Sequence, residues 1–127
     1  MKIYNGYNRL NENYTSLTDE YEYSMANTYL ESKKHKQKAV FDVFFRKIPN
    51  GGGYVVMAGL DKVIEYVKNL HFSEREINYF RRKGYSDDFL KYVSEFKFTG
   101  DIYAIPDGTP VFPNEPILTV KANLNEA

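Results

Sequence analysis

The side chains that most often carry out catalysis are few in this 127-residue sequence. It contains no cysteine and two histidines, His35 and His71. His35 lies in a run of lysines and His71 follows an apolar helical segment, and neither has carboxylates or a nucleophile at a recognised catalytic or metal-ligand spacing. The lack of cysteine excludes disulfides, zinc thiolate sites and cysteine nucleophiles. The sequence therefore predicts no catalytic residue and no metal site in this chain.

Glycine-rich and cationic runs also have simpler explanations than a phosphate site. Gly51–Gly53 lacks the lysine and hydroxyl residue of a phosphate-binding loop and the spaced glycines of a dinucleotide fold, so it predicts a turn. The lysine-rich run 33–38 and Arg81–Lys83 are typical of solvated helix ends. The net charge is zero, from 17 basic and 17 acidic side chains, so the chain has no global attraction for nucleic acid. We predict no nucleic-acid partner.

Two features are better suited to ligand binding. Asp19 and Tyr21 open a predicted helix, where backbone N–H groups and the positive end of the helix dipole hold anions. A tyrosine ring at that place can stack on a planar ligand. Arg46 lies on an apolar strand, and an arginine in such surroundings usually pairs with a carboxylate or a phosphate.

Helical periodicity predicts four helices that position these residues. The first begins near Thr18–Asp19, and we expect its apolar face to carry Tyr21, Met25, Thr28 and Tyr29. The second starts at Gly59, and its expected inward face carries Leu60, Val63, Ile64 and Val67. The third opens with a capping box at Ser73 and is ended by Gly84. The fourth is capped near Ser86 and turns inward Phe89, Leu90, Val93 and Phe96.

Segments rich in β-branched and aromatic residues predict the strands. We predict strands at Lys38–Ile48, Asp101–Ile105, Val111–Pro113 and Ile117–Val120. Tyr54–Met57 is read either as a short return strand or as an extension into the next helix. The order of strand, helices and strands predicts an α+β fold with a mixed or antiparallel sheet.

Composition predicts one globular domain. The sequence is 43% hydrophobic and 27% charged, which is close to the average for globular proteins. Its aromatic residues are 12 Tyr and 9 Phe with no Trp, so these rings are expected to fill a core or an interface. No segment approaches the ~20 apolar residues of a membrane span, and the first residues lack the apolar stretch of a signal peptide. We therefore expect a cytoplasmic protein without membrane contact.

Four segments together resemble one enzyme family. Leu17–Met25 is similar to the opening Leu-Thr-Asp-x-Tyr…Met helix of nicotinate phosphoribosyltransferases. Phe41–Pro49 with Gly52–Tyr54 is similar to the family's Phe-Phe-Arg, Pro and Gly-Gly segment, and Ala58–Leu60 matches the Ala-Gly-Leu that follows. Pro106–Leu118 resembles the family's Pro-x-Gly-x-x-x-Phe-Pro-x-Glu-Pro-x-Leu stretch. The four segments occur in the family's order, so the resemblance extends over nearly the whole chain.

The resemblance implies the amino-terminal domain of a type II phosphoribosyltransferase. Enzymes of this family condense nicotinate with phosphoribosyl pyrophosphate to give nicotinate mononucleotide in NAD salvage. ATP hydrolysis is coupled to the step, and ATP and Mg are expected in the full enzyme. These enzymes are formally grouped with ligases, although the reaction is a glycosyl transfer. Their α+β domain lies beside an irregular α/β barrel, which holds the phosphate loops and a phosphorylated histidine. We expect this chain to lack the barrel and to be inactive alone.

The resemblance also assigns binding roles. Tyr21 is expected to stack on the pyridine ring across the interface of a homodimer, and Thr18 and Asp19 are expected to shape the start of its helix. Arg46 is expected to contact a phosphate of the neighbouring subunit's ligand. Glu20 departs from the family pattern, in which the residue before the tyrosine is apolar or small.

The resemblance divides the chain into an arm at 1–16, a domain at 17–122 and, at 123–127, the start of a helix that leads to the barrel. Two alternatives stay open, a stand-alone interaction or regulatory module and a relative of quinolinate phosphoribosyltransferase. A surface that should face a barrel would be exposed here, so we also expect self-association.

Overall fold

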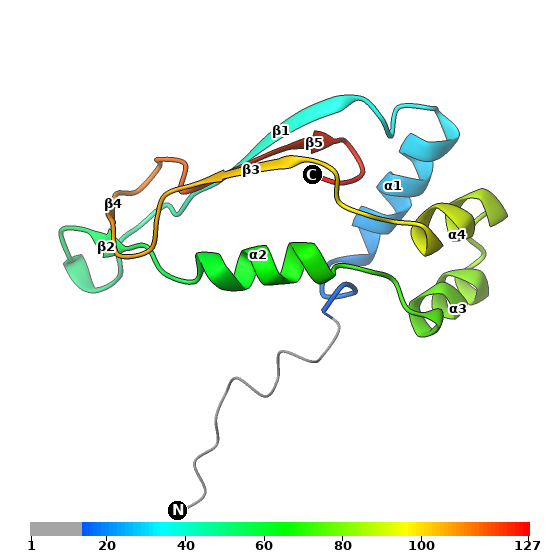
Figure 1. Ribbon diagram of the computed structural model, residues 1–127, viewed down its shortest axis with the longest axis horizontal. Helices are drawn as coiled ribbons and strands as arrows, with labels where there is room; N and C mark the ends of the chain where they lie inside the picture. Colours follow the sequence, from blue (N-terminus) through cyan, green and yellow to red (C-terminus); the bar gives the residue numbers. More distant parts are fainter. Residues whose placement is uncertain (1–13) are drawn as a thin grey trace, which may run out of the picture.

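A computed structural model describes residues 14–127, and most of the predicted arm therefore lies outside the described residues. Within these residues the fold is α+β, as predicted, with four α-helices and two antiparallel sheets (Figure 1). The helices are α1 (Glu20–Glu31), α2 (Leu60–Asn69), α3 (Glu74–Lys83) and α4 (Asp87–Ser94), with a 3-10 turn, η2, at Pro49–Gly51. The strands are β1 (Lys38–Val43), β2 (Val55–Val56), β3 (Asp101–Ala104), β4 (Pro110–Val111) and β5 (Leu118–Asn123).

The larger sheet has the order β1-β5-β3, and every pairing is antiparallel. Phe41 lies opposite Val120, which lies opposite Ile102, so these three side chains share one face of the sheet. That face is apolar throughout, because its other members are Ala39, Val43, Ala104, Leu118 and Ala122. The opposite face carries mostly polar side chains such as Lys121.

β1 ends at Val43 rather than at Ile48, so the prediction of a long strand is wrong in its second half. Two backbone hydrogen bonds still join the end of β1 and the residues after it to the segment before β5. The N–H of Ile117 donates to the carbonyl of Val43 (2.9 Å), and the N–H of Asn114 donates to the carbonyl of Phe45 (2.8 Å). The opposing segment 113–116 begins and ends with proline, and Asn114 has a φ of 62°. Proline has no N–H to donate, so a regular ladder cannot continue there.

The second sheet pairs β2 with β4, which decides between the two interpretations of Tyr54–Met57 in favour of a strand. β2 does not return along β1, however, because Val55 lies opposite Val111. The two sheets are placed apart, with the three-stranded sheet above α2 and the β2–β4 pair at one end of the molecule (Figure 1).

Helices α1, α3 and α4 gather at the other end and form the main core (Figure 1). Its buried members are Phe80, Phe89, Leu90 and Val93, with Phe80 and Phe89 each 1% exposed. Aromatic rings pack around Phe80 mostly edge to face, as in its 5.5 Å contact with Phe89. Ser73 and Glu76 form the predicted capping box of α3, and the Ser86 hydroxyl accepts from the N–H of Phe89 at the start of α4.

The buried face of α1 differs from the predicted one. Tyr23, Ala26 and Leu30 pack on the core, whereas Tyr21 and Met25 are 58% and 41% exposed. Both sets have helical spacing, so periodicity alone cannot decide which one faces inward. The predicted inward residues of α2 are also partly open, since Val63 and Ile64 are 36% and 37% exposed.

The last residues form a turn after β5, and the helix predicted to begin at 123–127 stays a prediction. Asn123 is the last residue of β5, and residues 124–126 turn back toward the helices. The N–H of Thr99 donates to the Glu126 carboxylate (2.7 Å), and the Asn125 amide donates to the carbonyl of Ala26 (2.9 Å). These bonds hold the turn against α1 and the segment before β3.

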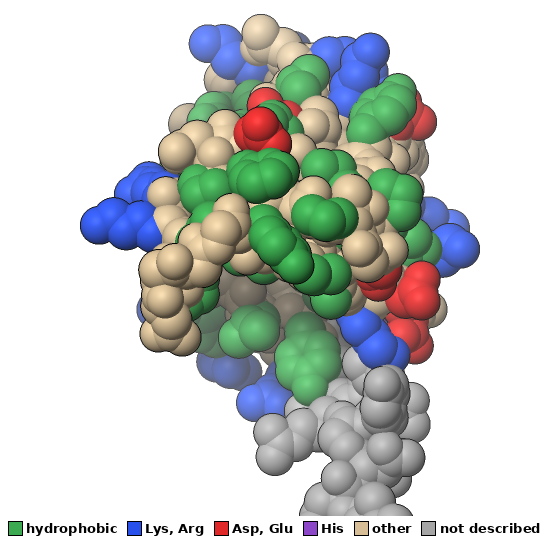
Figure 2. Space-filling view, turned by 90° about the vertical axis from the view of Figure 1, so that its left-hand side faces the viewer, with side chains coloured by type: hydrophobic (Ala, Val, Ile, Leu, Met, Phe, Trp, Pro, Cys, Tyr) green, Lys and Arg blue, Asp and Glu red, His purple; other side chains and the backbone are tan. Residues whose placement is uncertain are grey.

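Apolar side chains are exposed at the end of the molecule that carries β2 and β4. Figure 2 shows this end, and hydrophobic side chains gather across it. The large exposed residues of these segments are Phe44 (48%), Tyr54 (57%), Val56 (50%) and Phe112 (48%). An exposed apolar surface of this kind is typical of interaction sites.

Candidate ligand-binding site at the start of helix α1

Tyr23 fixes the start of α1 to the helical core. Its ring lies 4.8 Å from that of Phe80, and its hydroxyl donates to the carbonyl of Thr15 (3.2 Å). Burial, as the main cause, raises the pKa of the Tyr23 phenol to about 12. The carboxylate of Glu20 adds an ion pair with Lys83 of α3 (3.1 Å). The contacts of Tyr23 and the ion pair of Glu20 therefore fix the first turn of α1 to the core and to α3.

Tyr21 is presented to solvent because Tyr23 is anchored. Two residues correspond to about 200° around an α-helix, so a side chain two positions before an inward one points away from the core. Tyr21 is accordingly 58% exposed, and Leu17 and Met25 near it are 80% and 41% exposed. A hydrogen bond with Glu22, followed by the charges of Glu22 and Asp19, raises the pKa of Tyr21. A neutral, exposed ring on a fixed helix is suited to stacking on a planar group.

Asp19 is the N-cap residue of α1. Its backbone is extended, with φ −73° and ψ 144°, and its side chain makes no capping hydrogen bond. Its carbonyl accepts from the N–H of Glu22 (3.1 Å). The carboxylate is thus not used to satisfy the helix N-terminus.

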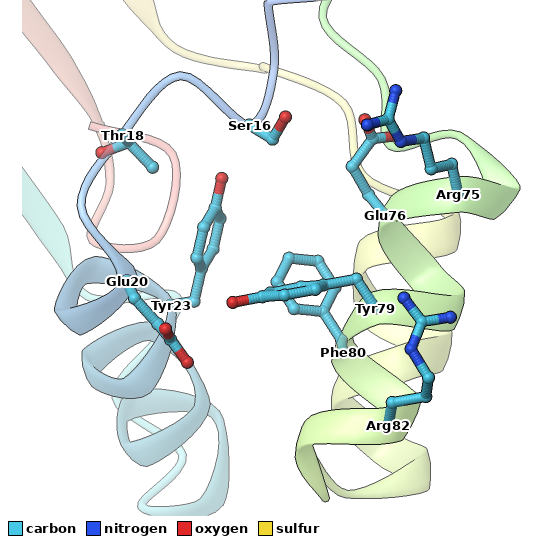
Figure 3. Close-up of a pocket in the computed structure, with 9 residues that line it drawn as sticks. All are labelled: Ser16, Thr18, Glu20, Tyr23, Arg75, Glu76, Tyr79, Phe80 and Arg82. Atoms are coloured by element: carbon cyan, nitrogen blue, oxygen red, sulfur yellow. The ribbon is translucent and has the colours of Figure 1, made fainter.

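Thr18 lies on the wall of a groove between α1 and α3, which has a volume of about 410 Å³ (Figure 3). Tyr21 does not line this groove. Arg46 lies in the exposed segment between β1 and η2, toward the end of the molecule opposite α1 (Figure 1). The structure therefore brings together Thr18, Asp19 and Tyr21 but does not bring Arg46 to them.

Sequence reasoning missed two structural features near the predicted site. Arg75, Tyr79 and Arg82 face the groove from α3, and their i, i+4 and i+7 spacing was the available signal. The second feature is Asp107, whose two carboxylate oxygens accept from the N–H groups of Gly59 and Leu60, each at 3.1 Å. Gly59 has a φ of 100° there, which favours glycine.

Among residues 14–127, no three His, Cys, Asp or Glu side chains gather as they would around a metal ion. No helix within residues 14–127 has both the length and the apolar character needed to cross a bilayer.

Comparisons with known proteins point to one family. The family described as nicotinate phosphoribosyltransferase (NAPRTase) N-terminal domain matches residues 17–127. A nicotinate phosphoribosyltransferase of Mycobacterium tuberculosis is 42% identical over 111 residues, which are 87% of this chain and 24% of that protein. The nicotinate phosphoribosyltransferase of Bacillus subtilis is 41% identical over 111 residues, again 87% of this chain and 23% of that protein. The chain thus spans about a quarter of the length of these relatives.

Solved structures share the fold. The crystal structure of human nicotinic acid phosphoribosyltransferase has a TM-score of 0.78 at 24% identity and covers 86% of this chain and 23% of its own. Nicotinate-nucleotide pyrophosphorylase from Pyrococcus furiosus has a TM-score of 0.59 at 20% identity and covers 99% of this chain and 24% of its own. At these identities the likeness is one of fold, and the sequence matches decide the family: the chain belongs to the nicotinate phosphoribosyltransferase N-terminal domain family.

Proposed function

We propose that this domain works as part of a nicotinate phosphoribosyltransferase and supplies Tyr21 as a stacking surface for nicotinate. The observation that carries the proposal is the 58% exposure of Tyr21 on a helix that Tyr23 and Glu20 fix to the core. The name shared by the curated relatives supplies the reaction. The complete enzyme would join nicotinate to phosphoribosyl pyrophosphate and form nicotinate mononucleotide in NAD salvage.

The role of Tyr21 follows from the chemistry of that step. The pyridine nitrogen donates its electron pair to the anomeric carbon of the sugar, the new C–N bond forms, and pyrophosphate leaves with the electrons of the broken C–O bond. A stacked aromatic pair contributes ~0.5–1.5 kcal/mol beyond its buried area. It also fixes the plane of the pyridine ring, and correct orientation lowers the barrier to attack.

A homodimer is part of the proposal. Tyr21 lies in the first turn of α1 and Arg46 in the segment between β1 and η2, and these two segments lie apart in one chain (Figure 1). A site shared between two copies would let Tyr21 and Arg46 each reach a ligand held by a neighbouring subunit. Sedimentation velocity would test association of the chain itself, and a clean monomer at high concentration would contradict it.

ATP, Mg and phosphoribosyl pyrophosphate belong to the proposed complete enzyme, and we assign them no residue other than Arg46. Thr18 and Asp19 are proposed to shape the start of α1. The domain alone is proposed to be inactive, and its location in the cytoplasm stays a prediction.

Isothermal titration calorimetry with nicotinate tests the role of Tyr21. We expect the chain to bind nicotinate weakly, Tyr21→Ala to weaken binding at least tenfold, and Tyr21→Phe to keep it within about threefold because the ring remains. Tyr29→Ala, on the same helix, serves as the matched control. Equal binding by the wild type and Tyr21→Ala would contradict the proposal.

A further inference from the structure

The groove between α1 and α3 is separate from the proposed nicotinate site. It has a volume of about 410 Å³, which is within the usual range for small-molecule sites. Its walls come from the segment before α1, from α1 itself and from one face of α3 (Figure 3). Tyr21 is not among the residues that line it.

The floor and sides of the groove are aromatic. Phe80 is 1% exposed, and its ring lies 4.8 Å from Tyr23 and 5.7 Å from Tyr79. Figure 3 shows the rings of Tyr23 and Tyr79 extending into the space between the two helices. Such walls are suited to a flat ring, which gains both apolar burial and edge or face contacts.

The acidic side chains of the groove already have partners. Glu20 pairs with Lys83 at 3.1 Å, outside the set of lining residues. Glu76 accepts from the N–H of Ser73 (2.8 Å) in the α3 capping box. Desolvation is the largest single influence on the pKa of Glu76 and raises it. The hydrogen bonds with Ser73 act in the opposite direction, and the pKa of Glu76 lies below its usual value. Both carboxylates therefore stay ionised and engaged.

The cationic side chains of the groove have no such partners. Within residues 14–127, neither Arg75 nor Arg82 forms an ion pair, although the two lie on one face of α3 with Tyr79 between them. Seven helical residues span about 10 Å, so the two guanidinium groups can approach a ligand from two places along the helix. Ser16 and Thr18, from the segment before α1, line the groove on the side opposite α3 (Figure 3).

We propose that this groove is a second ligand site, which binds a small molecule made of a flat aromatic ring and an anionic group. The ring would lie against Tyr23 and Tyr79, and Arg82 would hold the phosphate or carboxylate. Arginine matches both anions with paired N–H donors. The proposal does not depend on the role of Tyr21.

Amide chemical-shift titrations of the 127-residue chain test the proposal. The probes are adenosine monophosphate and benzoate, with adenosine and inorganic phosphate as the ring alone and the anion alone. We expect saturable shifts at residues 75–82, which lie away from Tyr21, with at least one of the first two probes. Binding of only adenosine monophosphate would assign the anion as phosphate, and binding of only benzoate would assign it as carboxylate.

Variants of two neighbouring arginines locate the site. Arg82→Gln should weaken binding about tenfold, because it removes the charge-assisted hydrogen bonds from the guanidinium group to the anion. Arg81→Gln is the matched control, since Arg81 is on the same helix but does not line the groove, and it should change affinity less than twofold. Tyr21→Ala should also leave this binding unchanged. Three results would each overturn the proposal: no saturable shift with either probe, equal losses in the two arginine variants, or inorganic phosphate binding as tightly as adenosine monophosphate.

Discussion

The two ends of the molecule are stabilised in different ways. Helices α1, α3 and α4 enclose a core in which Phe80 and Phe89 are each 1% exposed. The three-stranded sheet has an apolar face as well, but Phe41 and Val43 on that face are 52% and 50% exposed. The helical end therefore buries its aromatic residues within the chain, whereas the sheet end leaves many of them open to another surface. The buried helical core fixes the helix that carries Tyr21. The exposed apolar face of the sheet suits packing against another surface, as the proposed function requires.

The largest predicted effect separates a buried ring from an exposed one. Phe80→Ala should lower the free energy of unfolding by ~3–5 kcal/mol, since it removes a fully buried ring and leaves a cavity. Phe41→Ala, at a ring that is 52% exposed, should cost less than ~1.5 kcal/mol. Urea unfolding of both variants gives the comparison. Similar losses of unfolding free energy in the two variants would contradict the claim that the helical core buries its rings more completely than the sheet does.

The next effect tests a close approach between Gly100, just before β3, and β5. A Cβ added at Gly100 would lie 2.4 Å from the Cβ of Ala122 and 2.7 Å from the carbonyl oxygen of Lys121. Gly100→Ala should therefore cost ~1–3 kcal/mol through overpacking. Gly53→Ala is the control, because nothing lies within 4 Å of its added Cβ. Equal melting temperatures for the two variants would show that the segment before β3 shifts freely.

A smaller effect is expected at α2, which Asp107 connects to the loop between β3 and β4. Asp107→Ala removes two acceptors from the N–H groups of Gly59 and Leu60 and should cost ~0.5–2 kcal/mol. Asp101→Ala, at an exposed strand position, should cost less. Hydrogen exchange should show faster exchange in the first turn of α2 in the Asp107 variant. Unchanged exchange there would contradict the capping role.

A pH dependence is expected that belongs to the helical end. Burial raises the pKa of Tyr23 in the folded chain to about 12, above its ordinary value of 10.0. The folded state thus holds this proton more tightly than the unfolded state, so the contribution is complete below pH 10 and is lost as the pH rises toward 12. Tyr23→Phe should lose less stability than the wild type between pH 9.5 and 11.5 in urea unfolding. Parallel losses would contradict the assignment to Tyr23.

Local patterns were enough to predict much of the fold. The capping box at Ser73 and the cap at Ser86 define the starts of α3 and α4 because each depends on residues three positions apart. The α+β class was likewise predicted, and the structure decides the predicted mixed or antiparallel sheet in favour of antiparallel pairing. The extent of β1 was not, since its end depends on Asn114 and two prolines some 70 residues later.

The orientation of α1 shows why the site was harder to predict than the elements. Both Tyr21 and Tyr23 lie on apolar faces of the helix, and only the tertiary contact of Tyr23 with Phe80 decides which face is buried. The role that the family resemblance gives Tyr21 stays a prediction, whereas the predicted inward position of its ring is wrong, since the ring is 58% exposed. The groove was missed because its walls come from segments about 60 residues apart.

A domain exchange tests most directly whether this chain presents Tyr21 to nicotinate. Residues 17–127 would replace the matching region of the Bacillus subtilis nicotinate phosphoribosyltransferase, to which the chain is 41% identical. We predict that the chimera forms nicotinate mononucleotide, that Tyr21→Ala raises its KM for nicotinate at least tenfold, and that Tyr21→Phe stays within about threefold of the unmodified chimera. An active chimera whose KM for nicotinate is the same with alanine at position 21 would contradict the central claim.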